Sequence, residues 1–158
     1  MADGVFNIAK GRVNELVSRV ALNDPANSAL VVVLLQAAGT DAALEDFDTL
    51  DDILSDAAFT EATFTNYARQ ALTDSELSAP SPDDTNNRMD ADIPDLTYAN
   101  AGGTADNTLV KLLICYDADT TGGDDSAIVP LTHHDFSATT DGNTLQATIN
   151  SAGFYRAS

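Results

Sequence analysis

At 158 residues the chain fits one globular domain, and it carries 25 acidic against 7 basic residues, a formal net charge of −18 at pH 7. A surface this acidic repels phosphate backbones and anionic lipid headgroups, which argues against nucleic acid and membrane as partners. Only four of the acids are glutamates, and because aspartate favours turns and caps over helices and strands, the composition predicts many loops.

Residues 5–20 have the apolar spacing of one helical face. This pattern predicts an amphipathic helix that stops at the Asn-Asp-Pro of residues 23–25. Gly11 weakens the middle of this helix by roughly 1 kcal/mol relative to alanine. The apolar stripe needs cover, either from this domain's own sheet or from a neighbouring subunit.

Charge also sets the first residues apart. Three of the seven basic residues lie there, namely Lys10, Arg12 and Arg19. We therefore expect a helical arm over residues 1–22, followed by a β-sandwich domain over residues 23–158. The arm would dock a partner or a neighbouring copy through three apolar anchors, Phe6, Leu16 and Val17. Because the first residues lack the long apolar core of a signal peptide, we expect the protein to be made and kept in a cytoplasm, or in whatever that cytoplasm assembles.

The next segments predict two strands and a short helix. Residues 28–37 are apolar without a break and rich in β-branched side chains, as expected for a strand covered on both faces. A run of about ten residues is too short to span a bilayer, which takes roughly 20. Residues 46–57 predict a short helix capped by Asp48 or Thr49, and residues 63–72 alternate like a strand.

The second half of the chain reads as short strands separated by turns. Residues 78–88 predict an exposed loop, and Pro94 places the following extended segment at a sheet edge or breaks it. Residues 107–119 are the best candidate for a central strand, with Cys115 buried inside it. We therefore predict a mainly β fold, an antiparallel β-sandwich or small barrel with an N-terminal amphipathic helix and one short additional helix.

The stretch THHDFSATTDGNTLQATI, residues 132–149, predicts a β-hairpin that turns at Asp141-Gly142. In that register every apolar residue falls on one face of the hairpin. His134 then points inward and His133 to the opposite side, because successive strand residues alternate. Two histidines on opposite faces cannot share one metal ion.

No catalytic or cofactor motif is present in the sequence. It contains no Gly-x-Ser-x-Gly nucleophile elbow, no Gly-rich phosphate loop after a strand, and no basic patch with interleaved aromatic residues. His134 and Asp135 are adjacent on a predicted strand, so their side chains point apart and cannot act as a base and its orienting acid. We therefore predict a protein that is not an enzyme, with no catalytic residue, no cofactor and no metal.

The acidic segment of residues 117–128 matches part of a calcium-binding loop. Its first, third, fifth and sixth positions are Asp117, Asp119, Thr121 and Gly122. The twelfth position, which should be a bidentate glutamate, is Ile128, although Asp124 or Asp125 could supply oxygens in a different geometry. Acidic turns are common in a chain so rich in aspartate, so we favour a solvated turn and keep a calcium-dependent binding module as an alternative.

The order of several weak motifs resembles a family of small structural proteins of tailed bacteriophages. The segments that carry the resemblance are ANSALVVVLLQA, DDILSD, TNYARQAL, NRMDADIPDLTY, LVKLLICYDADTTGGDDSAIVPL and TTDGNTLQATINSAGFYR. They run through residues 28–155, and the N-terminal segment looks like an addition to the commoner pattern.

The resemblance implies a virion β-sandwich without enzymatic activity that decorates or cements the capsid exterior. A tail or head-to-tail connector component is the runner-up. The implied partners are the major capsid protein and copies of the chain itself, and the implied location is the capsid surface of a virion assembled in the bacterial host cytoplasm. The acidic body agrees with this role, because charge keeps many copies soluble until they meet their lattice. A small hydrolase stays open only if a pocket gathers His133 or His134 with distant acids.

Overall fold

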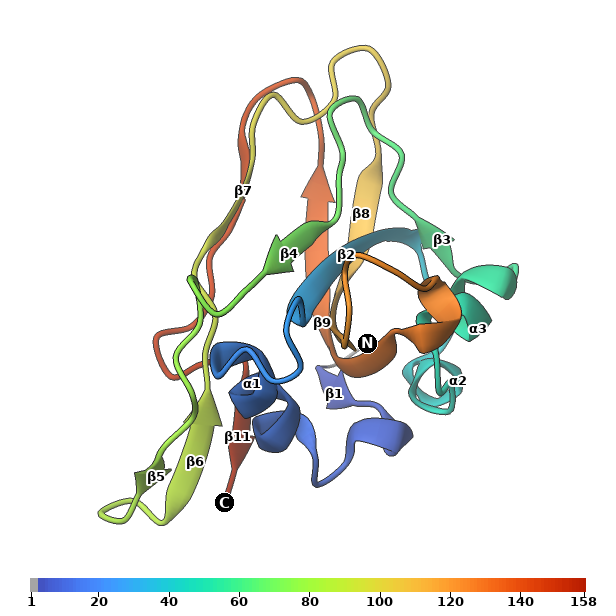
Figure 1. Cartoon of the computed structure of the whole chain (residues 1–158). Coiled ribbons are helices and arrows are strands. Elements are labelled where there is room, and N and C mark those ends of the chain that lie inside the picture. Colours follow the sequence, from blue (N-terminus) through green and yellow to red (C-terminus); the bar gives the residue numbers. More distant parts are fainter. Residues whose placement is uncertain (1–2) are drawn as a thin grey trace.

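A computed structural model describes residues 3–158 as a mainly β protein with antiparallel sheets (Figure 1). The main sheet has the order β1 (Gly4–Val5), β9 (Val129–Thr139), β8 (Thr108–Asp117), β2 (Ala29–Ala37) and β3 (Thr60–Glu61), and β4 (Gln70–Leu72) also pairs with β2. The prediction of a mainly β, antiparallel fold is therefore confirmed. This sheet does not close on itself, so the described strands form no barrel.

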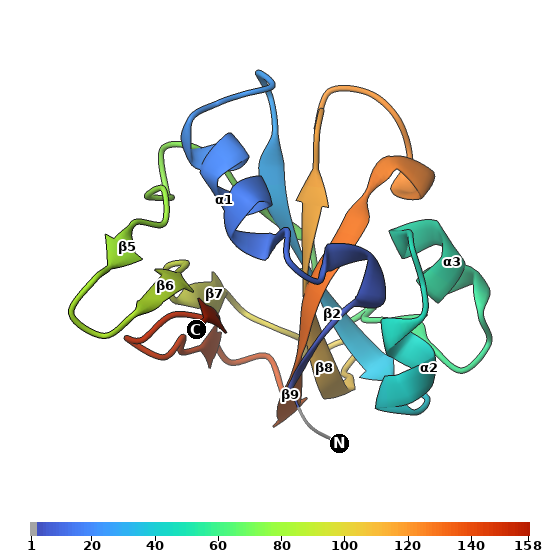
Figure 2. The same cartoon turned by 90° about the horizontal axis from the view of Figure 1, so that it is seen from below.

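Two smaller sheets complete the β structure. One pairs β10 (Leu145–Ala147) with β7 (Leu96–Tyr98), and the other has the order β11 (Tyr155–Ala157), β6 (Arg88–Ala91) and β5 (Pro82–Asp83). Seen from below, the central strands lie between these small sheets on one side and two short helices on the other (Figure 2). None of the described helices is long and apolar enough to cross a membrane.

Strands β2 and β8 form the centre of the core. They pair from Ala29 opposite Asp117 to Leu35 opposite Lys111, and the side chains from residue 29 to residue 35 are all buried. The unbroken apolar run thus forms a strand covered on both faces, as predicted. Cys115 is buried in β8, as predicted, and burial raises the pKa of its thiol to about 12.

The N-terminal segment differs from the predicted helix. Residues 1 and 2 lie outside the described residues. Strand β1 and a 3-10 turn (Asn7–Ala9) come first, and α1 spans only Val13–Ala21. Gly11 has a φ of +80°, a left-handed conformation that a continuous helix cannot contain, which explains the late start of α1.

The apolar stripe of this segment is covered by the protein's own strands. The three predicted docking anchors, Phe6, Leu16 and Val17, are each at most 3 % exposed and belong to the same hydrophobic cluster as β2 and β8. These side chains are core residues, so the prediction that they dock a partner is wrong. Of the two covers that the sequence left open, the domain's own sheet is the one the fold uses.

Two short helices follow β2 instead of the one that was predicted. Helix α3 (Leu50–Ser55) agrees with the prediction, and the Thr49 side chain caps it by accepting a hydrogen bond from the Asp52 N–H. The sequence analysis missed α2 (Asp41–Glu45), which Thr40 caps in the same way through the Ala43 N–H.

The predicted strand over residues 63–72 forms only at its end, as β4. Asn66 has a φ of +70°, which interrupts the extended backbone and lets the Tyr67 hydroxyl accept a hydrogen bond from the Leu34 N–H. Pro94 falls in the gap between β6 and β7, so it breaks the strand as one of the two predicted outcomes allowed. Residues 78–88 are mostly an exposed loop, but it folds back as the hairpin of β5 and β6.

The predicted hairpin of residues 132–149 is wrong in its partner strands. Asp141-Gly142 does form a turn, with the Asp141 carboxylate accepting from the Asn143 N–H. Strand β9, however, pairs with β8 along its length, and β10 pairs with β7. Alternation assigns residues to faces and does not choose the neighbouring strand, so the long apolar edge of β8 takes β9.

Candidate functional site

Strand β9 places different polar groups on its two faces. His133 and Asp135 point toward the helices, where they meet a lysine from β8, whereas His134 points toward the C-terminal segment. The prediction that the two imidazoles lie on opposite faces is confirmed. His133 is fully buried and His134 only half-buried, the reverse of the predicted inward position of His134.

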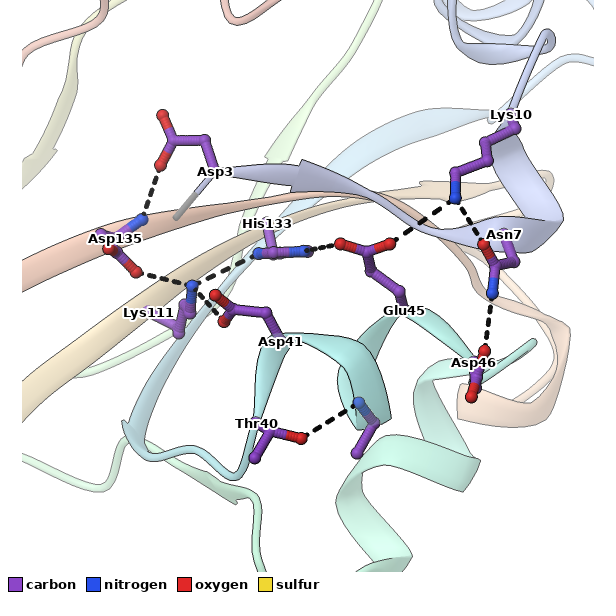
Figure 3. Close-up of polar contacts among 11 residues, drawn as sticks. Asp3, Asn7, Lys10, Thr40, Asp41, Glu45, Asp46, Lys111, His133 and Asp135 are labelled. Carbon is purple, nitrogen blue, oxygen red and sulfur yellow. Dashed lines mark hydrogen bonds and ion pairs between the residues drawn. The ribbon is translucent and has the colours of Figure 1, made fainter. Parts of the chain in front are cut away.

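On the first face lies the lysine cluster, made of Lys111, Asp41, Glu45, His133 and Asp135 (Figure 3). The Lys111 Nζ lies 2.8 Å from Asp41 Oδ1, 2.6 Å from Asp135 Oδ1 and 3.4 Å from His133 Nδ1. The other ring nitrogen of His133 lies 3.4 Å from Glu45 Oε1. The lysine side chain is 0 % exposed, while Asp41 is 24 % and Asp135 42 % exposed.

This cluster, with one further lysine that contacts it, ties four separate parts of the chain together. Asp41 and Glu45 stand one turn apart on α2, Lys111 comes from β8, and His133 and Asp135 come from β9. Glu45 also meets the Lys10 ammonium at 3.6 Å, which links the N-terminal segment to α2. A buried ammonium needs such carboxylate partners, because leaving it unpaired would cost several kcal/mol.

The electrostatics of the cluster favour a structural role over chemistry. Burial opposes the charged form of Lys111, but hydrogen bonds to Asp135 and Asp41 outweigh it and raise the pKa of the lysine. Burial, aided by the nearby Lys111 charge, lowers the pKa of His133. A lysine held as an ammonium is not a nucleophile. The neutral imidazole of His133 is fully buried and packs against the Phe6 ring, which stands edge-on with the ring centroids 5.6 Å apart.

On the second face lies the groove, a cavity of about 470 Å³ between the sheet and the C-terminal segment. Apolar and aromatic side chains form much of its wall: Leu112, Ile114, Phe136, Ala147, Ile149, Phe154 and Tyr155. Its titratable groups are those of Asp3, His134, Tyr155 and Arg156, together with Asp135 at the edge of β9. Its size falls in the range of ligand-binding clefts, roughly 300 to 1,000 Å³.

His134 connects two oxygens at the wall of the groove. Its Nδ1 lies 3.4 Å from Asp3 Oδ2, and its Nε2 lies 3.0 Å from the Thr132 hydroxyl. The order acid, imidazole, hydroxyl resembles a nucleophilic triad, the arrangement a small hydrolase would need. Thr132, however, is 1 % exposed and does not line the groove, so its hydroxyl is closed to a substrate.

The acidic segment that partly matches a calcium-binding loop uses its carboxylates for hydrogen bonds within the loop. Asp117 accepts from the Asp119 N–H, Asp119 accepts from the backbone and hydroxyl of Thr121, and Asp124 accepts from the backbone and hydroxyl of Ser126. Within residues 3–158, no group of three or more His, Cys, Asp or Glu side chains is arranged to hold a metal ion.

Asp125, the last carboxylate of that loop, belongs to an ion-pair network. The Arg69 guanidinium contacts both Asp125 oxygens, at 2.6 and 2.8 Å, and both Glu61 oxygens, at 2.8 and 2.7 Å. These bonds hold the loop against β3 and raise the pKa of Arg69. The structure therefore favours a solvated, internally bonded turn at residues 117–128.

Sequence reasoning missed the lysine cluster and the groove. A lysine inside the ten-residue apolar strand around residue 111 was a usable signal, because a buried lysine requires acidic partners nearby. The Thr-Asp of residues 40–41 was a second signal, as a helix start with Glu45 one turn later. No local sequence pattern predicts the groove, because its walls come from residues about 150 positions apart in the chain.

Comparisons with known proteins do not assign a family. No protein-family model matches the sequence, and searches of curated proteins and of solved structures found no match. The class that the fold and its two faces define is a strongly acidic, mainly β protein with antiparallel sheets and a surface groove beside its central sheet.

Proposed function

We propose that this protein is a non-enzymatic structural component of a tailed-bacteriophage virion. It decorates or cements the capsid exterior through protein contacts, with a sandwich-like β body, and its partners are the major capsid protein and further copies of itself. The proposal combines the order of sequence motifs across residues 28–155 with the charge arrangement of the fold. The charge arrangement is the observation that supports the proposal most strongly.

Nearly all of the positive charge is paired within the molecule. Six of the seven basic residues contact a carboxylate at 3.6 Å or less: Lys10, Arg19, Arg69, Arg88, Lys111 and Arg156. The surface therefore meets other molecules mainly through its excess carboxylates. Such a surface attracts a basic partner and repels both nucleic acid and free copies of the same protein.

These properties suit a protein that is held in many copies on a shell. Mutual repulsion keeps the unbound copies monodisperse, and a basic or neutral site on the capsid overcomes it locally. Association between free copies is also disfavoured because the cations are paired, the edge strands are short and the turns are acidic.

Co-sedimentation with virus particles tests the proposal. Particles are prepared from a genome in which the gene for this chain carries an early stop codon, and the purified chain is added back. We expect saturable binding in a fixed ratio to the major capsid protein, weakening as sodium chloride is raised because salt screens the attraction. Particles that already carry their full complement of the chain are the control and should bind no more.

Electron microscopy of the saturated particles then locates the chain. Density over the capsid shell would support the decoration role. Density confined to the tail or the head-to-tail junction would instead identify the chain as a tail or connector component. Failure to co-sediment, together with absence of the chain from particles made by the unaltered genome, overturns the virion proposal.

A further inference from the structure

The groove offers a carboxylate at the edge of an apolar and aromatic surface. Asp3 is 66 % exposed, and it lines the groove next to His134. Burial opposes its ionisation, but the hydrogen bond from the Asp135 N–H at 2.9 Å and the nearby imidazole outweigh this and lower the pKa of Asp3. The carboxylate is therefore charged at neutral pH and open to solvent.

The wall of the groove that the C-terminal segment forms is fixed by the backbone. Gly153 has a φ of +85°, and a Cβ there would lie 2.3 Å from the Ala91 carbonyl oxygen. The Phe154 N–H donates to that same oxygen at 2.9 Å, so the turn holds Phe154 against β6. The Phe154 ring stands edge-on to His134 with centroids 6.3 Å apart, which places an aromatic surface beside the acidic end of the groove.

The groove's own cation is already engaged. Arg156 donates from Nε to Asp90 Oδ1 at 2.7 Å and from Nη2 to Asp90 Oδ2 at 3.2 Å, a bidentate pair on β6. Asp135 likewise directs its carboxylate to Lys111 on the other face. The charge left for an incoming group is thus the carboxylate of Asp3, within a molecule of net charge −18.

We propose that the groove receives a lysine or arginine side chain of the capsid partner. Its cationic head pairs with Asp3 and its methylene stem lies against Phe136, Ile149 and Phe154, because long basic side chains bury their stems on apolar surface and their heads favour aromatic faces. This inference rests on the proposed virion function for the identity of the partner, and on the groove alone for the chemistry of the bound group.

The chemistry is tested first without any partner. N-acetyl-arginine amide and N-acetyl-lysine amide are titrated into the isotope-labelled protein, and N-acetyl-citrulline amide serves as the uncharged analogue of the arginine probe. We expect saturable amide shifts concentrated at Asp3, residues 134–136 and residues 149–156 with the cationic probes, and at least about tenfold weaker binding of citrulline. Shifts that are absent, or spread evenly over the acidic surface, overturn the proposal.

The partner is tested next with variants in particle binding. Asp3→Asn removes the charge while keeping an oxygen for the Asp135 N–H, and Phe154→Leu removes the aromatic face. Asp74→Asn is the matched control, since it removes the same charge from an exposed turn outside the groove. We expect each groove variant to weaken co-sedimentation about tenfold relative to the control.

The two proposals fail in different ways. If the unaltered chain binds particles and the groove variants bind as well as Asp74→Asn, the groove proposal is wrong and the virion proposal stands. If the chain binds no particle but the cationic probes still occupy the groove, the virion proposal is wrong. The groove would then bind a lysine or arginine side chain of a different partner.

Discussion

Lys111 and Asp135 face each other across strands β8 and β9, and the Lys111 Nζ contacts Asp135 Oδ1 at 2.6 Å although the lysine side chain has no exposure to solvent. Asp41 on α2 contacts the same nitrogen at 2.8 Å. One buried ammonium therefore links the centre of the sheet to α2. Its positive charge also compensates two carboxylates that would otherwise repel each other.

Substituting Lys111 separates its packing from its charge. Lys111→Ala should lower the free energy of unfolding by about 3 kcal/mol or more, because it removes a buried stem and the shared cation together. Lys111→Met keeps most of the stem, and the partly exposed carboxylates can be hydrated, so we expect it to cost about 1 to 2 kcal/mol. Urea unfolding measures both, and equal losses for the two variants would contradict the part assigned to packing.

The two histidines of β9 predict a loss of stability as the pH falls. Burial is the main cause that lowers the pKa of both His133 and His134 below the reference value of 6.5. The unfolded chain therefore takes up protons first, so the free energy of unfolding is highest above about pH 6.5 and decreases as the pH falls toward the folded-state values. Chemical unfolding at a series of pH values measures this, at high salt to screen the general repulsion of the carboxylates.

A matched pair of variants assigns this pH dependence. His133→Asn and His134→Asn should each reduce the slope between about pH 7.5 and pH 5.5, whatever their effect on overall stability. An unchanged slope in the double variant would mean that other groups dominate in this window.

The sequence predicted the parts of the fold that depend on local pattern. The unbroken apolar run of β2, the central strand β8 and the Thr49-capped helix α3 each follow from periodicity and capping within a dozen residues. Asp141-Gly142 was also a reliable turn signal. In each case the residues that specify the element are the residues that form it.

The predictions that failed depend on partners distant in the sequence. Strand β9 could alternate correctly with either β8 or β10 as its neighbour, and only the whole sheet decides. The amphipathic stripe near Phe6 could equally face a subunit or the chain's own core. The groove gathers residues from both ends of the chain, and the lysine cluster gathers them from α2, β8 and β9, so no single stretch contains their chemistry.

Gly153 should be intolerant of a side chain. Its φ is left-handed and an added Cβ would lie 2.3 Å from the Ala91 carbonyl oxygen, so Gly153→Ala must move the turn that carries Phe154. We expect a loss of about 2 kcal/mol or more and a changed environment for Phe154 in nuclear magnetic resonance spectra. Gly122→Ala is the control, because its Cβ would make only ordinary contact with Asp119 at 3.6 Å, and it should change stability by less than about 0.5 kcal/mol.

The acidic loop of residues 117–128 should not respond to calcium. Within residues 3–158 no three acidic or histidine side chains are arranged to hold a metal ion, and both oxygens of Asp125 are held by Arg69, so binding a cation would require the loop to rearrange. We expect the same melting temperature with millimolar calcium and with a chelator, and no calorimetric heat of binding. A rise of several degrees with calcium that Asp119→Asn abolishes would revive the calcium-dependent module, whereas Asp74→Asn, outside the loop, should leave any such rise intact.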